Sequence, residues 1–178
     1  MSLLIPRRLS RLPAAIWIRL LLHRALSGLR TLPIVIPGLV RSKDQRALLR
    51  EMLNFTGKLP GLLHLPLKET MYDLTTLPEQ TLSDPHSEAI VRNLADFAVL
   101  INRQTSLGFC LQRSLTRYYF LRREGLPVVV HFGARHADKD RPLLLAGHAW
   151  LALEGDPYYE EGEHWRGYVV MLSFPEDA

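Results

Sequence analysis

The hydrophobic pattern changes its period at one place in the chain, Gly125-Leu126-Pro127, and this change limits what the chain can fold into. Upstream, apolar residues recur at helical spacing, whereas downstream they form short β-branched runs typical of strands. Gly125 suits the position that follows a helix, and Pro127 prevents the helix from continuing. Helices followed by strands predict an α+β fold with a small antiparallel sheet.

The clearest helical period belongs to a segment that starts at Ser83-Asp84-Pro85, where a cap precedes an early proline. Its apolar residues lie three or four positions apart, which predicts one buried helix face. These residues are Ile90, Leu94, Phe97 and Ile101.

The first part of the chain is predicted to combine helices with long irregular connections. A helix is expected over residues 13–28, with a proline in its first turn. Ser42 caps a further helix, and Gln45 stands at the spacing of a capping box. Residues 31–40 contain two prolines and are predicted to be an irregular connector, and residues 54–83 lack a sustained period and are predicted to be a long loop.

Short strands are expected once the period has changed. The expected strands lie at residues 128–132, 148–153, 158–163 and 167–174, with a polar loop over 133–142 and a turn at 154–157.

Length and composition favour one folded domain with an extension. The chain has 178 residues, of which 47% are hydrophobic and 22% are charged, a balance that predicts folding rather than disorder. We expect a helical extension and long loop over residues 1–82 and the α+β domain over residues 83–178.

Charge is distributed unevenly along the chain. The first 30 residues contain six arginines and no acidic residue, and the last 25 contain seven acidic residues and one arginine. This asymmetry allows the N-terminal helix to make a peripheral contact with a membrane or an acidic partner. No glycine-rich phosphate loop and no basic surface interleaved with aromatic residues is visible, so nucleic acid is not expected as a partner.

Cysteine usage and hydropathy indicate the compartment. A single cysteine, Cys110, cannot form an internal disulfide, which favours the reducing cytoplasm. Arg19 interrupts the apolar stretch near the start, and no run approaches the roughly 18 to 20 apolar residues of a membrane span. We therefore expect neither a signal peptide nor a membrane-spanning helix.

Cys110 opens a predicted helix that ends near Gly125. Unpaired N–H groups and the positive end of the helix dipole favour a thiolate there, and the same N–H groups could receive an oxyanion. His148 begins a predicted strand and is the preferred general base, with His131 as a competitor. His131 and His136 could join Cys110 at a metal, but the spacing matches no structural zinc pattern, so we expect no metal and no other cofactor.

Several motifs after residue 84 occur in an order and spacing that resemble a known family. The motifs are Cys110-Leu111-x-x-Ser114-Leu115, Leu121-Arg122-Arg123-x-Gly125-Leu126-Pro127, a strand ending in Gly133, His148-Ala149-Trp150-Leu151 and the turn Glu154-Gly155. Over about residues 85 to 174 the chain resembles the transglutaminase-like domain of lasso-peptide biosynthesis, which is related in fold to papain-like cysteine proteases. The resemblance implies a nucleophile helix packed on a small antiparallel sheet, with Cys110 as nucleophile and His148 as base.

The acid expected behind the histidine departs from the family pattern. Members of the family carry an aspartate about a dozen residues after the histidine, where this chain has Glu160, with Glu161 as the alternative acid. A two-residue turn at Gly155-Asp156 would place Glu161 on the face of His148, and a bulge would exchange the two glutamates. Asp156 itself would lie at the hairpin tip, far from His148.

A possible oxyanion residue precedes the nucleophile. Gln104 lies six residues before Cys110, the separation at which papain-like proteases carry an oxyanion-hole glutamine.

The resemblance implies a cytoplasmic cysteine peptidase that removes the leader from a ribosomally synthesised precursor peptide through an acyl-enzyme. It also implies a separate leader-recognition protein and a cyclase as partners, because the first 80 residues read as helical rather than as a β-rich recognition domain. Two alternatives remain: a transglutaminase or amidase that acts on another substrate, and a non-catalytic peptide-binding module of the same fold.

Overall fold

The computed structural model describes residues 32–75, 85–102, 107–136, 145–160 and 165–176 of the chain. Residues 32–41 are helical. The further elements are α2 (Lys43–Leu62), α3 (Leu67–Thr75), α4 (Pro85–Ile101), α5 (Phe109–Arg123), β1 (Val129–His136), β2 (Leu145–Leu153), β3 (Asp156–Pro157) and β4 (Val169–Phe174). Helices precede strands, so the predicted α+β class is confirmed. The helix predicted over residues 13–28 lies outside the described residues.

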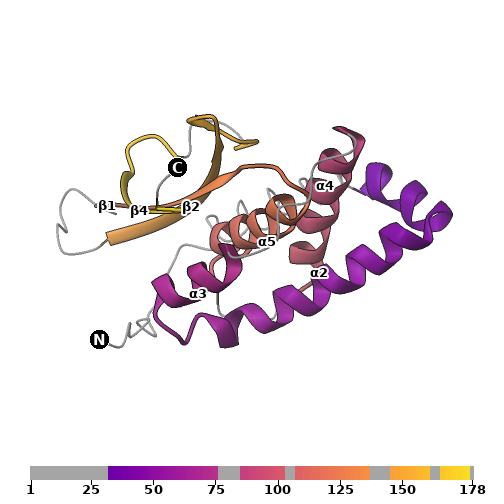
Figure 1. Ribbon diagram of the computed structural model, residues 1–178, viewed down its shortest axis with the longest axis horizontal. Coiled ribbons are helices and arrows are strands. Elements are labelled where there is room, and N and C mark those ends of the chain that lie inside the picture. Colours follow the sequence, from indigo (N-terminus) through magenta and orange to yellow (C-terminus); the bar gives the residue numbers. More distant parts are fainter. Residues whose placement is uncertain (1–31, 76–84, 103–106, 137–144, 161–164, 177–178) are drawn as a thin grey trace, which may run out of the picture.

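Helix α5 lies between the sheet and the other helices, as Figure 1 shows. The sheet is antiparallel with the strand order β3-β2-β1-β4. In the central pair, Gly133 of β1 stands opposite His148 of β2, and His131 stands opposite Trp150. The sheet therefore presents its central strands to the helix that carries the cysteine.

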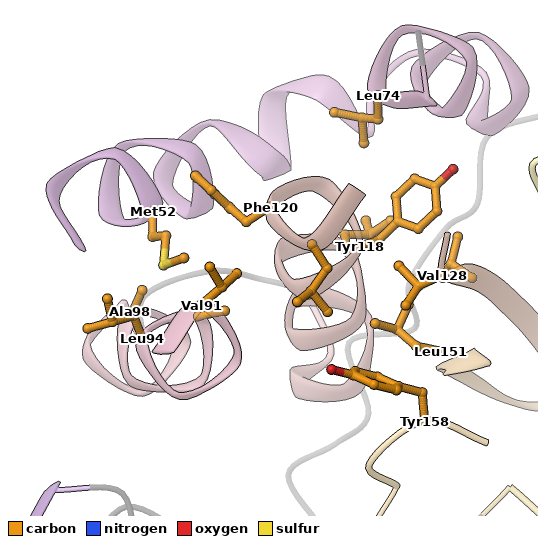
Figure 2. Packing of buried hydrophobic residues seen from close by; sticks show 14 of the residues in the cluster. Met52, Leu74, Val91, Leu94, Ala98, Tyr118, Phe120, Val128, Leu151 and Tyr158 are labelled. Atoms are coloured by element: carbon orange, nitrogen blue, oxygen red, sulfur yellow. The ribbon is translucent and has the colours of Figure 1, made fainter. Parts of the chain in front are cut away.

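One hydrophobic core joins the helices to the sheet around α5 (Figure 2). Tyr118, Phe120 and Leu121 of α5 are fully or almost fully buried. Residues of α2 and α4 pack against one side of this helix, and residues of β1 and β2 pack against the other. Burial on this scale, at roughly 25 cal/mol per Å² of apolar surface, is the main force that holds α5 against the sheet.

The ends of two helices follow the predicted signals. Ser42 is the N-cap of α2, and its hydroxyl accepts a hydrogen bond from the N–H of Gln45 at 3.2 Å. Helix α5 ends in a Schellman motif, in which Gly125 has a φ of +88° and the N–H of Leu126 bonds to the carbonyl of Leu121 at 3.0 Å.

Two predicted irregular segments are helical instead. The connector predicted over residues 31–40 is helical from residue 32, and residues 54–62 and 67–75 of the predicted long loop belong to the end of α2 and to α3. Burial overrides local preference here, since Val35, Thr56 and Leu59 lie in the protein interior despite nearby prolines and glycines. Thr56 is stabilised by a 3.1 Å hydrogen bond from Asn102.

The inner face of α4 differs slightly from the predicted one. Ile101 is 52% exposed rather than buried. The buried residues of this helix are Val91, Leu94, Ala95, Ala98 and Val99. The small residues Ala95 and Ala98 allow α4 to pack close to its neighbours. The spacing of the large apolar residues did not predict that these two alanines are buried.

Two strands also differ from the prediction. Strand β1 continues through Gly133 to His136, where a polar loop was predicted. The returning strand β3 stops at Pro157 and does not run on through residues 158–160. Within the described residues, no helix is long and apolar enough to cross a membrane.

The division of the chain at residue 83 stays a prediction. Met52 and Leu59 of α2 and Met71 and Leu74 of α3 belong to the same core as α4 and α5.

Replacing Gly125 with alanine should destabilise the protein by about 1 kcal/mol, because alanine disfavours the left-handed backbone that closes α5. Gly61→Ala is the matched control, since Gly61 lies in α2 and a Cβ there meets nothing within 4 Å. That variant should stabilise the protein by roughly 0.5 to 1 kcal/mol. Urea unfolding of both variants measures the difference, and equal effects would contradict the assignment of the cap.

Candidate active site

Cys110 is the second residue of α5 and lies partly buried. The N-cap is Gly108, which has no side chain to bond the first amides of the helix. The first hydrogen bond within the helix runs from the N–H of Gln112 to the carbonyl of Gly108 at 3.1 Å. The N–H of Cys110 therefore has no acceptor within its own helix and remains directed toward the helix start.

The beginning of α5 packs along the side of β2 that β3 leaves uncovered. Strand β3 pairs only with Ala152 and Leu153 of β2. Farther along, the hydroxyl of Ser114 donates to the carbonyl of Ala149 at 2.9 Å, and the N–H of Ala149 donates to the sulfur of Cys110. Two residues one helical turn apart thus bond the backbone of β2 where a further strand would otherwise pair.

His148 precedes Ala149 on β2, and its imidazole bonds to Cys110. Trp150 stacks on the imidazole with ring centroids 5.7 Å apart, and Tyr168 lies 5.2 Å away. Gly133 makes room for the indole, because a Cβ there would lie 2.7 Å from Trp150 and 3.0 Å from Tyr168. The imidazole is consequently held between two rings at a fixed orientation.

Contact between the two side chains favours their charged forms. Burial raises the pKa of the Cys110 thiol, but bonds from His148 and from the N–H groups of Ala149 and Leu111 outweigh it and leave the pKa below its ordinary value. Contact with Cys110, followed by contact with Glu160, raises the pKa of His148 to about 9. Both shifts favour the form of the pair in which Cys110 is a thiolate and His148 an imidazolium.

The structure places Glu160 behind His148. Its carboxylate is 3% exposed, and its Oε2 lies 3.8 Å from His148 Nε2, an ion-pair distance rather than a direct hydrogen bond. Nη2 of Arg113 donates to both carboxylate oxygens at 2.9 Å. Burial raises the pKa of Glu160, but His148, Arg113 and Arg117 together lower it by more. The pKa therefore lies below its ordinary value, and the carboxylate is ionised at neutral pH.

Glu160 reaches this place because the chain leaves the sheet early. The turn lies at Glu154-Gly155, as in the family motif, rather than at the alternative Gly155-Asp156, and the ladder ends at Pro157. Tyr159 then adopts a φ of +48°, which turns the backbone. The regular hairpin that would have put Glu161 on the face of His148 does not form, because residues 158–160 are not part of a strand.

Helices α4 and α5 anchor the segment before Glu160 through side chains that the sequence analysis did not single out. Arg117 bonds the carbonyl of Tyr159 at 3.3 Å and forms a twofold ion pair with Asp96 at 2.6 and 2.5 Å. On α4, Glu88 accepts a hydrogen bond from the Tyr158 hydroxyl, and Arg92 lies 3.4 Å from the centre of the Tyr159 ring. The spacing of Glu88, Arg92 and Asp96, four residues apart on one helix face, was the available sequence signal.

Among the candidate residues that the structure describes, His131 and Asp156 do not join this group. Gln104 and Glu161 lie outside the described residues. His131 bonds to the hydroxyl of Ser173 at 2.8 Å, and burial lowers its pKa. Asp156 lies beside the turn, as expected. In the described part of the chain, no three His, Cys, Asp or Glu residues are grouped so that they could hold a metal ion.

A charged thiolate, a proton-bearing imidazole and a buried carboxylate in contact form an arrangement capable of nucleophilic acyl transfer. The thiolate can attack a carbonyl carbon, and the imidazolium can protonate the group that leaves. The amide of Cys110 faces the side of the helix where the carbonyl oxygen would become charged.

Comparison with known proteins identifies one family. The family model described as the transglutaminase-like superfamily matches residues 59–173, which is more than half of the chain. No curated protein and no solved structure matches the chain.

Alkylation of Cys110 by iodoacetamide should proceed at pH values well below those at which an ordinary thiol reacts, because the imidazolium stabilises the thiolate. His148→Gln removes that stabilisation and leaves the effect of burial, so the rate at neutral pH should fall about tenfold for each unit of the resulting pKa rise. As a control, the unchanged protein and the His148→Gln variant are both unfolded in denaturant, where their Cys110 thiols should be alkylated at the same rate. A native rate no faster than the unfolded rate would contradict the thiolate assignment.

Gly133→Ala should cost roughly 1 to 3 kcal/mol of stability, because the new methyl group overlaps Trp150 and forces the indole toward His148. The same variant should slow alkylation of Cys110. Gly147→Ala on the opposite strand is the control, since its nearest atom would lie 4.0 Å away, and should leave both properties unchanged. Thermal unfolding and alkylation rates test this, and similar behaviour of the two variants would exclude the steric role.

Proposed function

The chain belongs to the transglutaminase-like superfamily, and from this premise we propose that it is a cysteine peptidase that cleaves the leader from a ribosomally synthesised precursor peptide. The superfamily includes cysteine peptidases and transglutaminases. The observation that carries the proposed chemistry is the contact of Cys110 at the start of α5 with His148, which Glu160 approaches from behind.

The proposed reaction has two stages. The Cys110 thiolate attacks the scissile carbonyl carbon, and the oxyanion that forms accepts a hydrogen bond from the Cys110 amide. The His148 imidazolium gives its proton to the departing amine as the carbon–nitrogen bond breaks, leaving a thioester. Neutral His148 then takes a proton from water as the water oxygen attacks the thioester carbon. The carbon–sulfur bond breaks, the new acid leaves, and Cys110 is again a thiolate beside the protonated His148.

Glu160 has a supporting part in this proposal. A carboxylate beside Nε2 stabilises the imidazolium in the resting state and keeps the other ring nitrogen directed toward the sulfur. Because Arg113 and Arg117 keep the carboxylate ionised, it does not take the proton from His148.

The proposed substrate class comes from the sequence motifs over about residues 85 to 174 and from their resemblance to lasso-peptide leader peptidases. The described residues before β1 contain helices and no strand, unlike the β-rich domains that recognise leaders. We therefore propose that a separate protein recognises the leader, that a cyclase acts on the released core, and that nucleic acid has no part in the reaction. The site as proposed needs no cofactor.

The same proposal places the reaction in the cytoplasm, since a site that depends on one unpaired thiol suits a reducing compartment. The basic first 30 residues remain available for a peripheral membrane contact or for the partner proteins.

Cys110→Ala should abolish cleavage and leave a folded protein, because it removes the nucleophile and a single sulfur atom from a partly buried position. The measurement is mass spectrometry of the precursor peptide encoded beside this chain, incubated with the full-length protein with and without the recognition protein. Far-ultraviolet circular dichroism of the variant provides the control for folding. Cleavage that survives this substitution would refute the proposal.

The same experiment identifies whether water or an amine accepts the acyl group from Cys110. Cleavage in heavy-oxygen water should label the new carboxylate, whereas an added primary amine should not appear in the product. An amine adduct formed in preference to the acid would identify a transglutaminase or amidase. Tight binding of the leader peptide by this chain alone would contradict the proposal that a separate protein recognises the leader.

A further inference from the structure

Arg113 makes contacts that the proposed reaction does not account for. Its side chain is only 16% exposed, and in the described part of the chain its hydrogen bonds go to Glu160 alone. Its Nε is buried without a hydrogen-bond partner in that part, which ordinarily costs about 1 to 3 kcal/mol. The one strong contact of this arginine is therefore its ion pair with Glu160.

The place of Arg113 on α5 relates it directly to the nucleophile. It lies three residues after Cys110, so both side chains project toward β2 from the same end of one helix. The helix thereby fixes the sulfur on one side of His148 and the carboxylate of Glu160 on the other. Arg117, one turn farther on, bonds the backbone of Tyr159 rather than the carboxylate.

Glu160 needs such a partner because its other contacts leave its side chain free to move. The carboxylate lies 3.8 Å from His148, too far for a direct hydrogen bond to hold it. A glutamate has one more rotatable bond than an aspartate, and a buried carboxylate with one distant cation would become protonated or turn toward solvent. The two 2.9 Å bonds from Arg113 prevent both outcomes.

We propose that Arg113 is a positioning residue that holds the Glu160 carboxylate, ionised, opposite Nε2 of His148. It acts through Glu160 and does not touch the substrate or the sulfur. Its catalytic importance rests on the proposed function, whereas its effect on His148 does not and can be measured without any substrate.

The groups that face this pair come from three elements. Arg113 and Arg117 approach Glu160 from α5, and His148 approaches it from β2. On α4, Asp96 pairs with Arg117, and Arg92 and Glu88 pair with each other and with the two tyrosines before Glu160. Arg113 is the member of this set that bonds the carboxylate itself.

The test is an NMR titration of the His148 imidazole, with its signal assigned by its loss in H148Q. In the unchanged protein the imidazole should titrate near 9. Glu160→Gln should lower that midpoint by about one unit, and Arg113→Gln should lower it by a similar amount, because the carboxylate no longer supports the imidazolium. Arg113→Lys, which retains a cation, should recover part of the shift.

The direction of the shift separates positioning from a simple charge effect. Removing a nearby cation without moving the carboxylate would raise the midpoint, since the imidazolium would lose a repulsive neighbour. An R113Q midpoint that rises or stays unchanged would therefore overturn the proposal. In the R113Q/E160Q double variant the midpoint should not fall below that of E160Q, because no carboxylate is left for Arg113 to hold. A further fall would show that Arg113 acts independently of Glu160.

The matched control is Arg123→Gln. Arg123 lies on the same helix and pairs with a carboxylate, that of Glu51, away from the site, so His148 should titrate as in the unchanged protein. Where peptide cleavage is observed, R113Q should lower kcat about tenfold with little change in KM, because substrate contacts are intact. Absence of cleavage in all proteins would refute the proposed function and leave the titration result standing.

Discussion

The hydrogen bonds between α5 and the backbone of Ala149 are the interaction on which the rest of the site depends. The Ser114 hydroxyl donates a hydrogen bond to the carbonyl of this residue, and the sulfur of Cys110 accepts one from its N–H. Both backbone groups lie on the side of β2 where β3 pairs only with Ala152 and Leu153, so no strand pairs there at Ala149. Burying that edge against a helix without partners would be costly, and the two small polar side chains remove the cost. The nucleophile is thus one of the groups that satisfy the sheet.

Charge alternates along the buried line from the helix to the sheet and back. In the form that the contacts favour, Arg113 is positive, Glu160 negative, His148 positive and Cys110 negative, so the group as a whole is close to neutral. Removing such charges from water is unfavourable unless each has a partner, and each of them does. The neighbouring Asp96–Arg117 pair repeats the pattern one helical turn away. Reactivity at Cys110 is therefore a property of the whole set and not of the helix dipole alone.

The sequence indicated the parts of the site that are local in the chain. The helix that starts near Cys110 follows from its capping glycine, and the strand of His148 follows from the apolar run Ala149 to Leu153. The α+β class follows from the order of helices and strands. The position of Glu160 did not follow, because it depends on where the hairpin leaves the sheet and on the left-handed backbone at Tyr159. Those features are set by α4 and α5, which are distant in sequence. The helices over residues 54–75 were missed for a related reason: only burial against α4 and α5 compensates for their weak helix propensity.

The hydrogen bond from Ser114 to Ala149 spans 35 residues of the chain. Ribosomes make proteins from the N-terminus, so α5 is completed well before β2 exists. Until that strand has been synthesised and has packed against the helix, Cys110 has no imidazole beside it. Its sulfur also has no hydrogen bond from the N–H of Ala149. The growing chain therefore carries an ordinary thiol, and Cys110 gains the contacts that favour its thiolate only when the domain has finished folding.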